Sequence, residues 1–466
     1  MSEGDPGRPI ESDGRVVTEL KLFGTLGFPI ILTQLSQMGI GVIDSIMAGR
    51  VSPTDLAGVA LGGNFYFPPV VLLAGIAMAV TPTMSQMHGA GDEARGGAVV
   101  RQALWIAVVG GLLAMGLMQF GEAGYRLIGV DEEAIPVATA YLTYMSFGVV
   151  PTIAFFVLRY LCEGLSWTTP SMVVAFGGLA LKLPLNYLFV YGGLGIPAMG
   201  GAGCGLSSAI IMWLQLFAMI FIVRYSRVQR AGAFSEFSLP DFSVIWRLVK
   251  LGIPIGITMF FEGTVFSVVT LLIGRLSVEA VAAHQVVFNV GSVTSMIPVA
   301  LGVAATIRAG YNVGAKDYPG ARRSVYVALA AALTFAVLAA TVLLLFRDLI
   351  ASAYTTDMNV LASASALLII LALYQFVDDT QTTAIGCLRG YKDVRIPMGI
   401  VLCSHWGIGI PVGSVLGYGL FGLEPWGVSG FWWGLITGFG IATISLNTRL
   451  AFLSRSEQRI RRYAEA

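Results

Sequence analysis

The sequence has little charge and little cysteine. Charged side chains make up 12% of the 466 residues and hydrophobic ones 56%, whereas a soluble domain carries about 25% charged residues. This composition excludes an ordinary soluble enzyme. The formal net charge of +1 creates no overall field that would attract a nucleic acid. The four cysteines are not spaced like a disulfide framework or a metal site. We therefore expect free thiols at Cys162, Cys204, Cys387 and Cys403.

The first twenty residues lack the features of a signal peptide. They are polar and mixed in charge, without a short apolar core or a small-residue cleavage site. We expect residues 1–22 to form a cytoplasmic tail. Histidine is scarce too, and the three in the chain follow no metal-binding pattern. No histidine metal site is therefore predicted.

Long apolar runs dominate the rest of the chain. A helix needs about 20 apolar residues to cross roughly 30 Å of hydrocarbon. Many of the 57 glycines and 19 prolines lie within these runs, a pattern that membrane helices tolerate. We predict an all-α integral membrane protein with twelve transmembrane helices, at 23–48, 58–87, 98–121, 136–161, 170–192, 202–224, 248–272, 280–311, 324–346, 360–388, 396–418 and 428–452.

The distribution of lysine and arginine predicts the orientation. If both termini are cytoplasmic, 23 of the 28 basic residues lie in cytoplasmic segments and four in outer loops, while Lys182 lies within a span. Cytoplasmic loops of membrane proteins carry an excess of Lys and Arg. One helix more or fewer would move later loops to the opposite side of the membrane and remove the excess of basic residues on one side. The observed excess therefore also favours a count of twelve helices.

The two halves of the chain repeat. At an offset of 225 residues, LGFPIILT at 26–33 aligns with LGIPIGIT at 251–258, and the register continues without a gap. Six helices separate the copies, so both halves enter the membrane in the same direction. We predict two six-helix bundles joined by a linker. The expected segments are the N-terminal tail 1–22, the bundles 23–224 and 248–452, the cytoplasmic linker 225–247 and the cytoplasmic C-terminal tail 453–466.

Four acidic residues and one lysine fall inside the predicted spans, away from the basic residues at the span ends. An ionised side chain near the bilayer centre costs on the order of 2.5–3.5 kcal/mol, so such residues are candidates for function. They are Asp44, Lys182, Glu262, Asp378 and Asp379. A buried acid can also simply accept hydrogen bonds from neighbouring helices, but three separate acidic helices favour a functional role.

The first-half candidates lie on two helices. Gln37 and Asp44 are seven residues apart, two helical turns, and share one face. Lys182 lies near the centre of its span and Asn186 follows one turn later. A lysine at this depth needs a partner, either as a structural counter-charge to an acid such as Asp44 or as part of ion coupling. The spacing leaves both alternatives open.

The second half carries more negative charge. Glu262 aligns with Gln37 at the 225 offset, so an acid replaces an amide. Tyr374 and Asp378 lie four residues apart on one helix face, whereas Asp379 points about 100° away. Carboxylate oxygens suit a hard cation such as Na⁺, and desolvated carboxyl groups suit protons. We therefore expect the stronger cation site, for Na⁺ or H⁺, at Glu262 and Asp378.

Several segments resemble the NorM-type branch of the multidrug and toxic compound extrusion (MATE) family. They include GFPIILTQLSQMGIGVIDSIMAG, LPLNYLFVYGGLGIPAMGGAGCG and AIGCLRGYKD, and the likeness runs from about residue 22 to 453. The resemblance implies a V-shaped pair of six-helix bundles in the bacterial inner membrane. It also implies export of hydrophobic, often cationic compounds in exchange for Na⁺ or H⁺. The family's acids on its first, seventh and tenth helices fall on Asp44, Glu262 and Asp378.

Two positions depart from the family pattern. Lys182 stands where relatives commonly carry Asn, in a motif resembling N-x-P-x-N, and that Asn belongs with the helix-1 acid. A Lys182–Asp44 ion pair is therefore an alternative to an ion or proton site at Asp44. Asp379 is the second departure, because a small or apolar residue is usual beside the helix-10 acid. We expect it to deepen the negative field of the second half.

These features predict a cation-coupled multidrug antiporter and leave two rivals. A lipid-linked precursor flippase would need a more basic cleft than Lys182 alone provides. A membrane enzyme with a DDxxD metal motif is disfavoured, because Asp378-Asp379 is followed by Thr382 at the required acidic position. We expect no enzymatic activity, no cofactor other than the coupling ion, no nucleic-acid partner, and a monomer that binds amphipathic or cationic drugs within the lipid bilayer.

Overall fold

The chain is helical throughout the part that the computed structural model describes, residues 16–193 and 195–465. Within those residues there is no β-strand, and one isolated bridge joins Gly193 to Ile196. Residues 1–15 of the expected tail 1–22 lie outside the described residues. The remainder of that tail is already helical, because the first helix begins at Val16.

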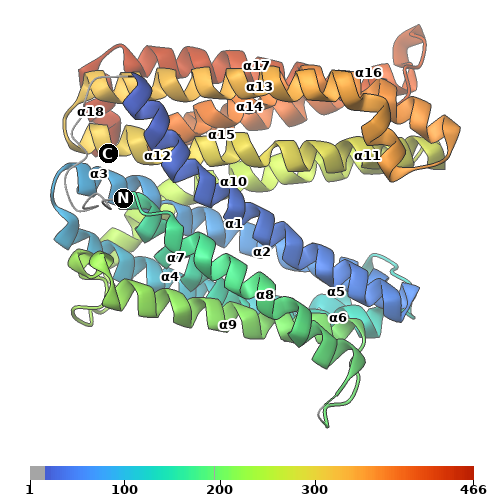
Figure 1. Cartoon of the computed structure of the whole chain (residues 1–466), viewed down its shortest axis with the longest axis horizontal. Helices are drawn as coiled ribbons and strands as arrows, with labels where there is room; N and C mark the ends of the chain where they lie inside the picture. The colour runs from blue at the N-terminus through green and yellow to red at the C-terminus, as the bar shows by residue number, and fades with distance from the viewer. Residues whose placement is uncertain (1–15, 194, 466) are drawn as a thin grey trace. The chain divides into compact units, whose positions relative to one another are not determined.

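The helices follow one another with short connections, from blue at the N-terminus to red at the C-terminus in Figure 1. In chain order they are α1 (Val16–Val51), α2 (Pro53–Met78), α3 (Val80–Gly89), α4 (Glu93–Met118), α5 (Gly121–Leu127), α6 (Ile135–Ser146), α7 (Val149–Gly164), α8 (Thr169–Tyr191), α9 (Gly201–Tyr225), η1 (Arg227–Ala231), α10 (Phe242–Ile273), α11 (Val278–Thr294), α12 (Met296–Gly314), α13 (Tyr318–Tyr354), α14 (Met358–Gly390), α15 (Arg395–Leu402), the π-helical turn η2 (Cys403–Gly409), α16 (Ile410–Tyr418), η3 (Leu420–Gly422), α17 (Val428–Ser454) and α18 (Glu457–Glu465).

Every predicted span has a helical counterpart. Eleven helices of the described chain are long and apolar enough to cross a membrane, and the pair α6 and α7, bent by 46°, accounts for the twelfth. The bend lies at Phe147 and Gly148, where the glycine packs against Ala209 and Met212 of α9. Some spans consist of consecutive helices, such as α2 with α3 and α11 with α12. The prediction of an all-α protein with twelve spans is confirmed.

The described chain packs as two compact units. One comprises residues 28–256, and the other comprises residues 16–27 together with 257–465. The division passes through α1 and α10, close to the prolines of the repeated motif. Along the chain these units differ from the bundles 23–224 and 248–452, because the opening turns of α1 and α10 each pack with helices of the other half.

A buried ion pair holds the opening turns of α1 in the second unit. Arg308 of α12 donates through Nε and Nη2 to the two carboxylate oxygens of Glu19, at 3.1 and 2.6 Å. Ser324 of α13 donates to the same carboxylate at 3.2 Å. One turn further along α1, Phe23 is fully buried. The start of α1 is therefore fixed to α12 and α13 by the hydrogen-bonded Glu19 carboxylate.

Glycines allow the opening turns of α10 to approach α2 in the first unit. A Cβ atom on Gly75 would collide with the backbone of Gly256, and one on Gly252 would collide with the backbone of Ile76. Small residues let membrane helices come close enough for extensive van der Waals contact. The α2–α10 contact therefore depends on the absence of side chains at these positions.

The connection between the two repeated halves is fixed to α4. Residues 226–241 separate α9 from α10, somewhat fewer than the expected linker 225–247. Arg101 of α4 donates to the Gly232 carbonyl at 2.7 Å and forms an ion pair with Glu236 at 2.9 Å. The segment is therefore held within the first unit along its length.

Candidate functional site

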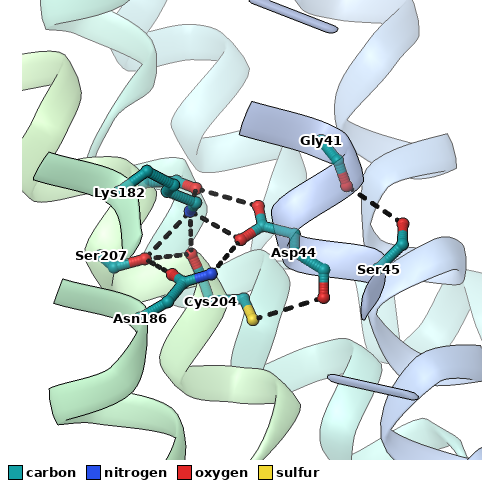
Figure 2. A network of polar contacts seen from close by, with 8 residues as sticks. Gly41, Asp44, Ser45, Lys182, Asn186, Cys204 and Ser207 are labelled. Carbon is teal, nitrogen blue, oxygen red and sulfur yellow. Dashed lines mark hydrogen bonds and ion pairs between the residues drawn. The ribbon is translucent and has the colours of Figure 1, made fainter. Parts of the chain in front are cut away.

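Lys182 and Asp44 form a buried ion pair in the first unit. The Nζ atom of Lys182 lies 2.7 Å from Oδ1 of Asp44, and the lysine side chain is 0% exposed. Figure 2 shows the lysine of α8 and the aspartate of α1 pointing toward each other. The Lys182–Asp44 ion pair that the sequence offered as an alternative is therefore present in the structure.

Oxygen atoms of α9 surround the Lys182 ammonium group. Nζ donates to Ser208 Oγ at 2.5 Å, to Ser207 Oγ at 2.9 Å and to the Cys204 carbonyl at 3.2 Å. An ammonium group has three donor hydrogens, so these oxygens and Asp44 satisfy it completely. The lysine is held in the way that a monovalent cation would be held by oxygen ligands.

Asn186 completes the network around the aspartate. Its Nδ2 donates to Asp44 Oδ1 at 2.7 Å, and its Oδ1 accepts a hydrogen bond from Ser207. Ser208 lies 3.4 Å from the other carboxylate oxygen of Asp44. The charges of Asp44 and Lys182 cancel, so this network (Figure 2) retains no net negative charge while both are ionised.

The local sequence explains why these helices meet. Lys182 and Asn186 are four residues apart and therefore lie on one face of α8. The glycine-rich start of α9 lets that helix approach its neighbours, because a Cβ on Gly203 would strike the backbone of Phe189, and one on Gly205 would strike that of Tyr141. This close approach brings the α9 hydroxyl groups within reach of Lys182.

In the second unit, a hydrogen-bonded chain leads from Glu262 to His405. Gln381 of α14 donates to Glu262 Oε1 of α10 at 3.1 Å, and its own carbonyl oxygen lies 3.1 Å from His405 Nε2. An ionised carboxylate only accepts hydrogen bonds, so Gln381 must present its NH₂ group to Glu262. Its carbonyl then requires a proton on His405 Nε2. The histidine ring is stacked on Phe439, with 3.8 Å between the ring centroids.

Asp378 lies near Glu262 and is hydrogen-bonded to Tyr374. The two residues lie one turn apart on α14, and the tyrosine hydroxyl donates to the carboxylate. The Asp378 and Glu262 carboxylates are within electrostatic range of each other, and Arg389 is within range of Glu262. The structure therefore gathers Glu262, Asp378 and Tyr374 in one region.

Asp379 lies apart from that hydrogen-bonded group. It is fully buried, and neither of its carboxylate oxygens has a hydrogen-bond partner among the described residues. Both side-chain polar atoms of Gln375, one turn earlier, are also buried without such a partner. Because adjacent residues on a helix diverge by about 100°, Asp379 adds charge near Asp378 without sharing its contacts.

The donor atoms in the second unit are compatible with a hard monovalent cation. Glu262 and Asp378 supply carboxylate oxygens and Tyr374 a hydroxyl, which are the ligand types that hard cations prefer. Within the described residues, no group of three or more His, Cys, Asp and Glu side chains has a metal-binding arrangement. Carboxylate and hydroxyl oxygens are ligand types that suit a hard cation rather than a soft transition metal.

Some residues of these networks escaped sequence reasoning. Ser207, Ser208 and the Cys204 carbonyl were not predicted as partners of Lys182, although a double serine after a glycine-rich run on an apolar helix was the available signal. Gln381 was not among the predicted site residues. Conversely, no hydrogen bond joins the half-buried Gln37 to the Asp44 network within the described part of the chain.

Buried ion pairs near the helix ends were also missed. Arg159 and Glu163 of α7 lie 2.6 Å apart with almost no exposure. Arg449 of α17 pairs with Asp393 at 2.8 Å. Arginines close to the span ends were counted toward the cytoplasmic segments, and their ion-pair partners were not considered.

Comparison with known proteins identifies the family of the chain. The MatE family model matches residues 29–188 and 254–415. The multidrug resistance protein PmpM of Pseudomonas aeruginosa is 42% identical, covering 99% of this chain and 98% of that protein. The multidrug resistance protein NorM of Aliivibrio fischeri is 37% identical, covering 93% and 95%. The multidrug resistance protein MdtK of Proteus mirabilis is 36% identical, covering 96% and 98%.

Solved structures agree with the fold. The eukaryotic MATE transporter AtDTX14 has a TM-score of 0.86 at 20% identity, covering 97% of this chain and 99% of that one. The Vibrio cholerae MATE transporter VcmN in its bent form has a TM-score of 0.85 at 17% identity, covering 96% and 99%. Together with the family match over both halves and the full-length relatives, these findings show that the chain belongs to the MatE family, the multidrug and toxic compound extrusion transporters.

Proposed function

We propose that this protein is a secondary active multidrug efflux transporter that exports hydrophobic and cationic compounds in exchange for Na⁺ or H⁺. The observation that carries the proposal is the group of Glu262, Asp378 and Tyr374 within a membrane-spanning chain of the MatE family. The names of the relatives, all multidrug resistance proteins, support the substrate class.

Glu262 and Asp378 hold the coupling ion. Two carboxylates close together in a region of low dielectric repel each other, and binding of Na⁺ or H⁺ relieves that repulsion. Tyr374 orients Asp378 through its hydroxyl group, and Gln381 orients Glu262. The buried carboxyl group of Asp379 deepens the negative field at this site.

A drug cation competes with the coupling ion at Glu262. The same stretch of α10 carries the half-buried rings of Phe260 and Phe261, and Phe261 lies edge-to-face with Trp406, with 5.3 Å between the ring centroids. Aromatic faces attract organic cations and bury apolar drug surface. Occupancy by the ion favours a conformation in which the drug leaves, and the reverse holds by thermodynamic reciprocity.

Asp44 and Lys182 tune proton or substrate handling in the first unit. We base this assignment on the Lys182 ammonium, which occupies the Asp44 carboxylate that a proton or a drug cation would otherwise bind. Asn186 fixes the carboxylate, and we assign a supporting role to Gln37 on the same helix. Replacing Lys182 by Asn should change the pH dependence of transport, and an unchanged pH profile would contradict this role.

The proposed orientation in the membrane is based on the distribution of lysine and arginine along the chain. We place the protein in the bacterial inner membrane with both termini in the cytoplasm, acting as a monomer on amphipathic or cationic drugs. It needs no cofactor other than the coupling ion, has no nucleic-acid partner and catalyses no reaction.

Drug uptake into everted membrane vesicles tests the proposal. Uptake of a fluorescent cationic drug should require an imposed ion gradient, and Glu262→Gln combined with Asp378→Asn should reduce the gradient-driven rate at least about tenfold, or ~1.4 kcal/mol. Glu279→Gln is the matched control, because Glu279 is an exposed acid in the first turn of α11. An unchanged rate of drug uptake in the double variant would contradict the assignment of Glu262 and Asp378 as the coupling site.

A further inference from the structure

A groove of about 770 Å³ lies in the second unit between the opening turns of α1 and one face of α13. Its wall is almost entirely apolar and includes Val16, Leu20, Val327, Ala331, Phe335 and Leu338. Several of these side chains are well exposed, with Leu20 at 53% and Leu338 at 59%. In a membrane-spanning protein, such a surface faces lipid rather than water.

Basic and aromatic side chains gather at one end of the groove. Arg322, Arg323 and Tyr326 line it there, next to Pro319 in the first turn of α13. Arg322 uses Nε to donate to the Ser454 carbonyl at 3.0 Å. A guanidinium group has five donor hydrogens, so the arginine is anchored and still has donors to offer. The distribution of lysine and arginine along the chain assigns this end to the cytoplasmic side.

The dimensions of the groove match one membrane leaflet. From Arg322 to Leu338 the helix rises by about 24 Å, at 1.5 Å per residue. Half of the hydrocarbon core is about 15 Å, and the head-group region adds several ångströms. The arginines thus lie at the level of the lipid phosphates, Tyr326 at the interface, where tyrosine is enriched, and Leu338 near the middle of the bilayer.

We propose that this groove binds one anionic phospholipid. An acyl chain lies along α13, and the phosphate of the head group is held by Arg322 and Arg323. Basic pockets on the cytoplasmic side of membrane proteins bind anionic head groups, because each arginine near the surface adds about 1 kcal/mol of attraction. The chain's own residues 1–15 do not match the apolar wall, because Met1 and Ile10 are their only large apolar side chains.

The lipid would also reinforce the packing of α1. Val16 and Leu20 flank Glu19, whose carboxylate is held by Arg308 and Ser324. A phospholipid in the groove touches both α1 and α13 and so stabilises the docked opening turns. We therefore expect anionic lipid to raise the unfolding temperature of the purified protein.

Lipid binding by the detergent-purified full-length protein tests the proposal. Native mass spectrometry should detect one tightly bound phosphatidylglycerol, and phosphatidylcholine should bind far more weakly. Arg322→Gln with Arg323→Gln should weaken phosphatidylglycerol binding about 30-fold, the factor expected for two surface arginines. Arg224→Gln with Arg230→Gln is the matched control, because it removes the same charge from exposed positions outside the groove and should leave binding unchanged.

A second pair of variants separates the groove from simple charge attraction. Ala331→Phe fills the apolar wall, so it should displace the lipid although both arginines remain. Leu333→Phe enlarges an exposed side chain of the same helix outside the groove and should have no effect. Equal binding of phosphatidylcholine, thermal stabilisation by inorganic phosphate alone, or retained phosphatidylglycerol in the Ala331→Phe variant would each overturn the proposal.

Discussion

The buried charge of Lys182 is compensated by its surroundings in the first unit. A lysine in the hydrocarbon region is costly, and here its ammonium is matched by the Asp44 carboxylate and by oxygens of α9. Breaking a buried ion pair by removing one partner leaves the other charge buried and uncompensated. The pair is therefore a structural requirement of the first unit as well as a functional candidate.

Replacing Lys182 by Met should destabilise the protein by ~3–5 kcal/mol, because it leaves Asp44 buried without its counter-charge. The unfolding temperature in detergent measures the effect. Combining Lys182→Met with Asp44→Asn should recover much of the loss, because both charges are then absent. If the double variant is as unstable as the single one, the ion pair does not account for the stability of this region.

Residue types identify the acids and the lysine, but not how they are paired. The cost of burying a charge in hydrocarbon is enough to single out Asp44, Lys182, Glu262 and Asp378 from the sequence alone. Pairing depends on which helix faces meet, and that is set by side-chain packing between segments distant in sequence. For this reason the role of Gln381 as the partner of Glu262 was beyond the reach of spacing arguments.

At the scale of elements, the opening turns of α1 depend on a single buried carboxylate. Glu19→Ala should leave Arg308 without its ion-pair partner, and the opening turns should detach more often from α12 and α13. Limited proteolysis near residue 20 should then become faster. Lys21→Ala is the matched control, because Lys21 is exposed on the same turn. Equal cleavage rates in the two variants would contradict the docking role of Glu19.

The contact between α2 and α10 gives a second element-scale prediction. Gly75→Ala places a methyl group against the Gly256 backbone, and such overpacking costs about 1–3 kcal/mol. The unfolding temperature should fall. Gly63→Ala in the same helix meets no atom within 4 Å, so it should be neutral or slightly stabilising. Equal effects of the two substitutions would show that the helices do not pack as closely as described.

The elements themselves were predictable, whereas their partners were not. Hydropathy found all twelve spans because each needs a long apolar run. The repeat located the beginning of the second half through LGFPIILT and LGIPIGIT. Hydropathy does not say which helices a segment packs against, so the packing of the α1 and α10 openings with the other half emerged only from the structure.

At the scale of the whole molecule, the two repeated halves have the same order of transmembrane helices but differ in the charge that they bury. The first half holds Asp44 together with its own counter-ion, Lys182. The second half holds Glu262, Asp378 and Asp379 on α10 and α14. Because the halves differ in this way, we propose that ion coupling depends mainly on the second half, and this is the central claim of the proposed function.

Transport by the purified protein in liposomes, with Na⁺ and H⁺ gradients imposed separately, tests this claim most directly. One of the two gradients should drive a cationic drug against its own concentration gradient, and drug addition should in turn drive movement of that ion. Glu262→Gln with Asp378→Asn should abolish both fluxes, while Glu279→Gln should preserve them. Gradient-driven transport that persists at the wild-type rate in the double variant would contradict the account.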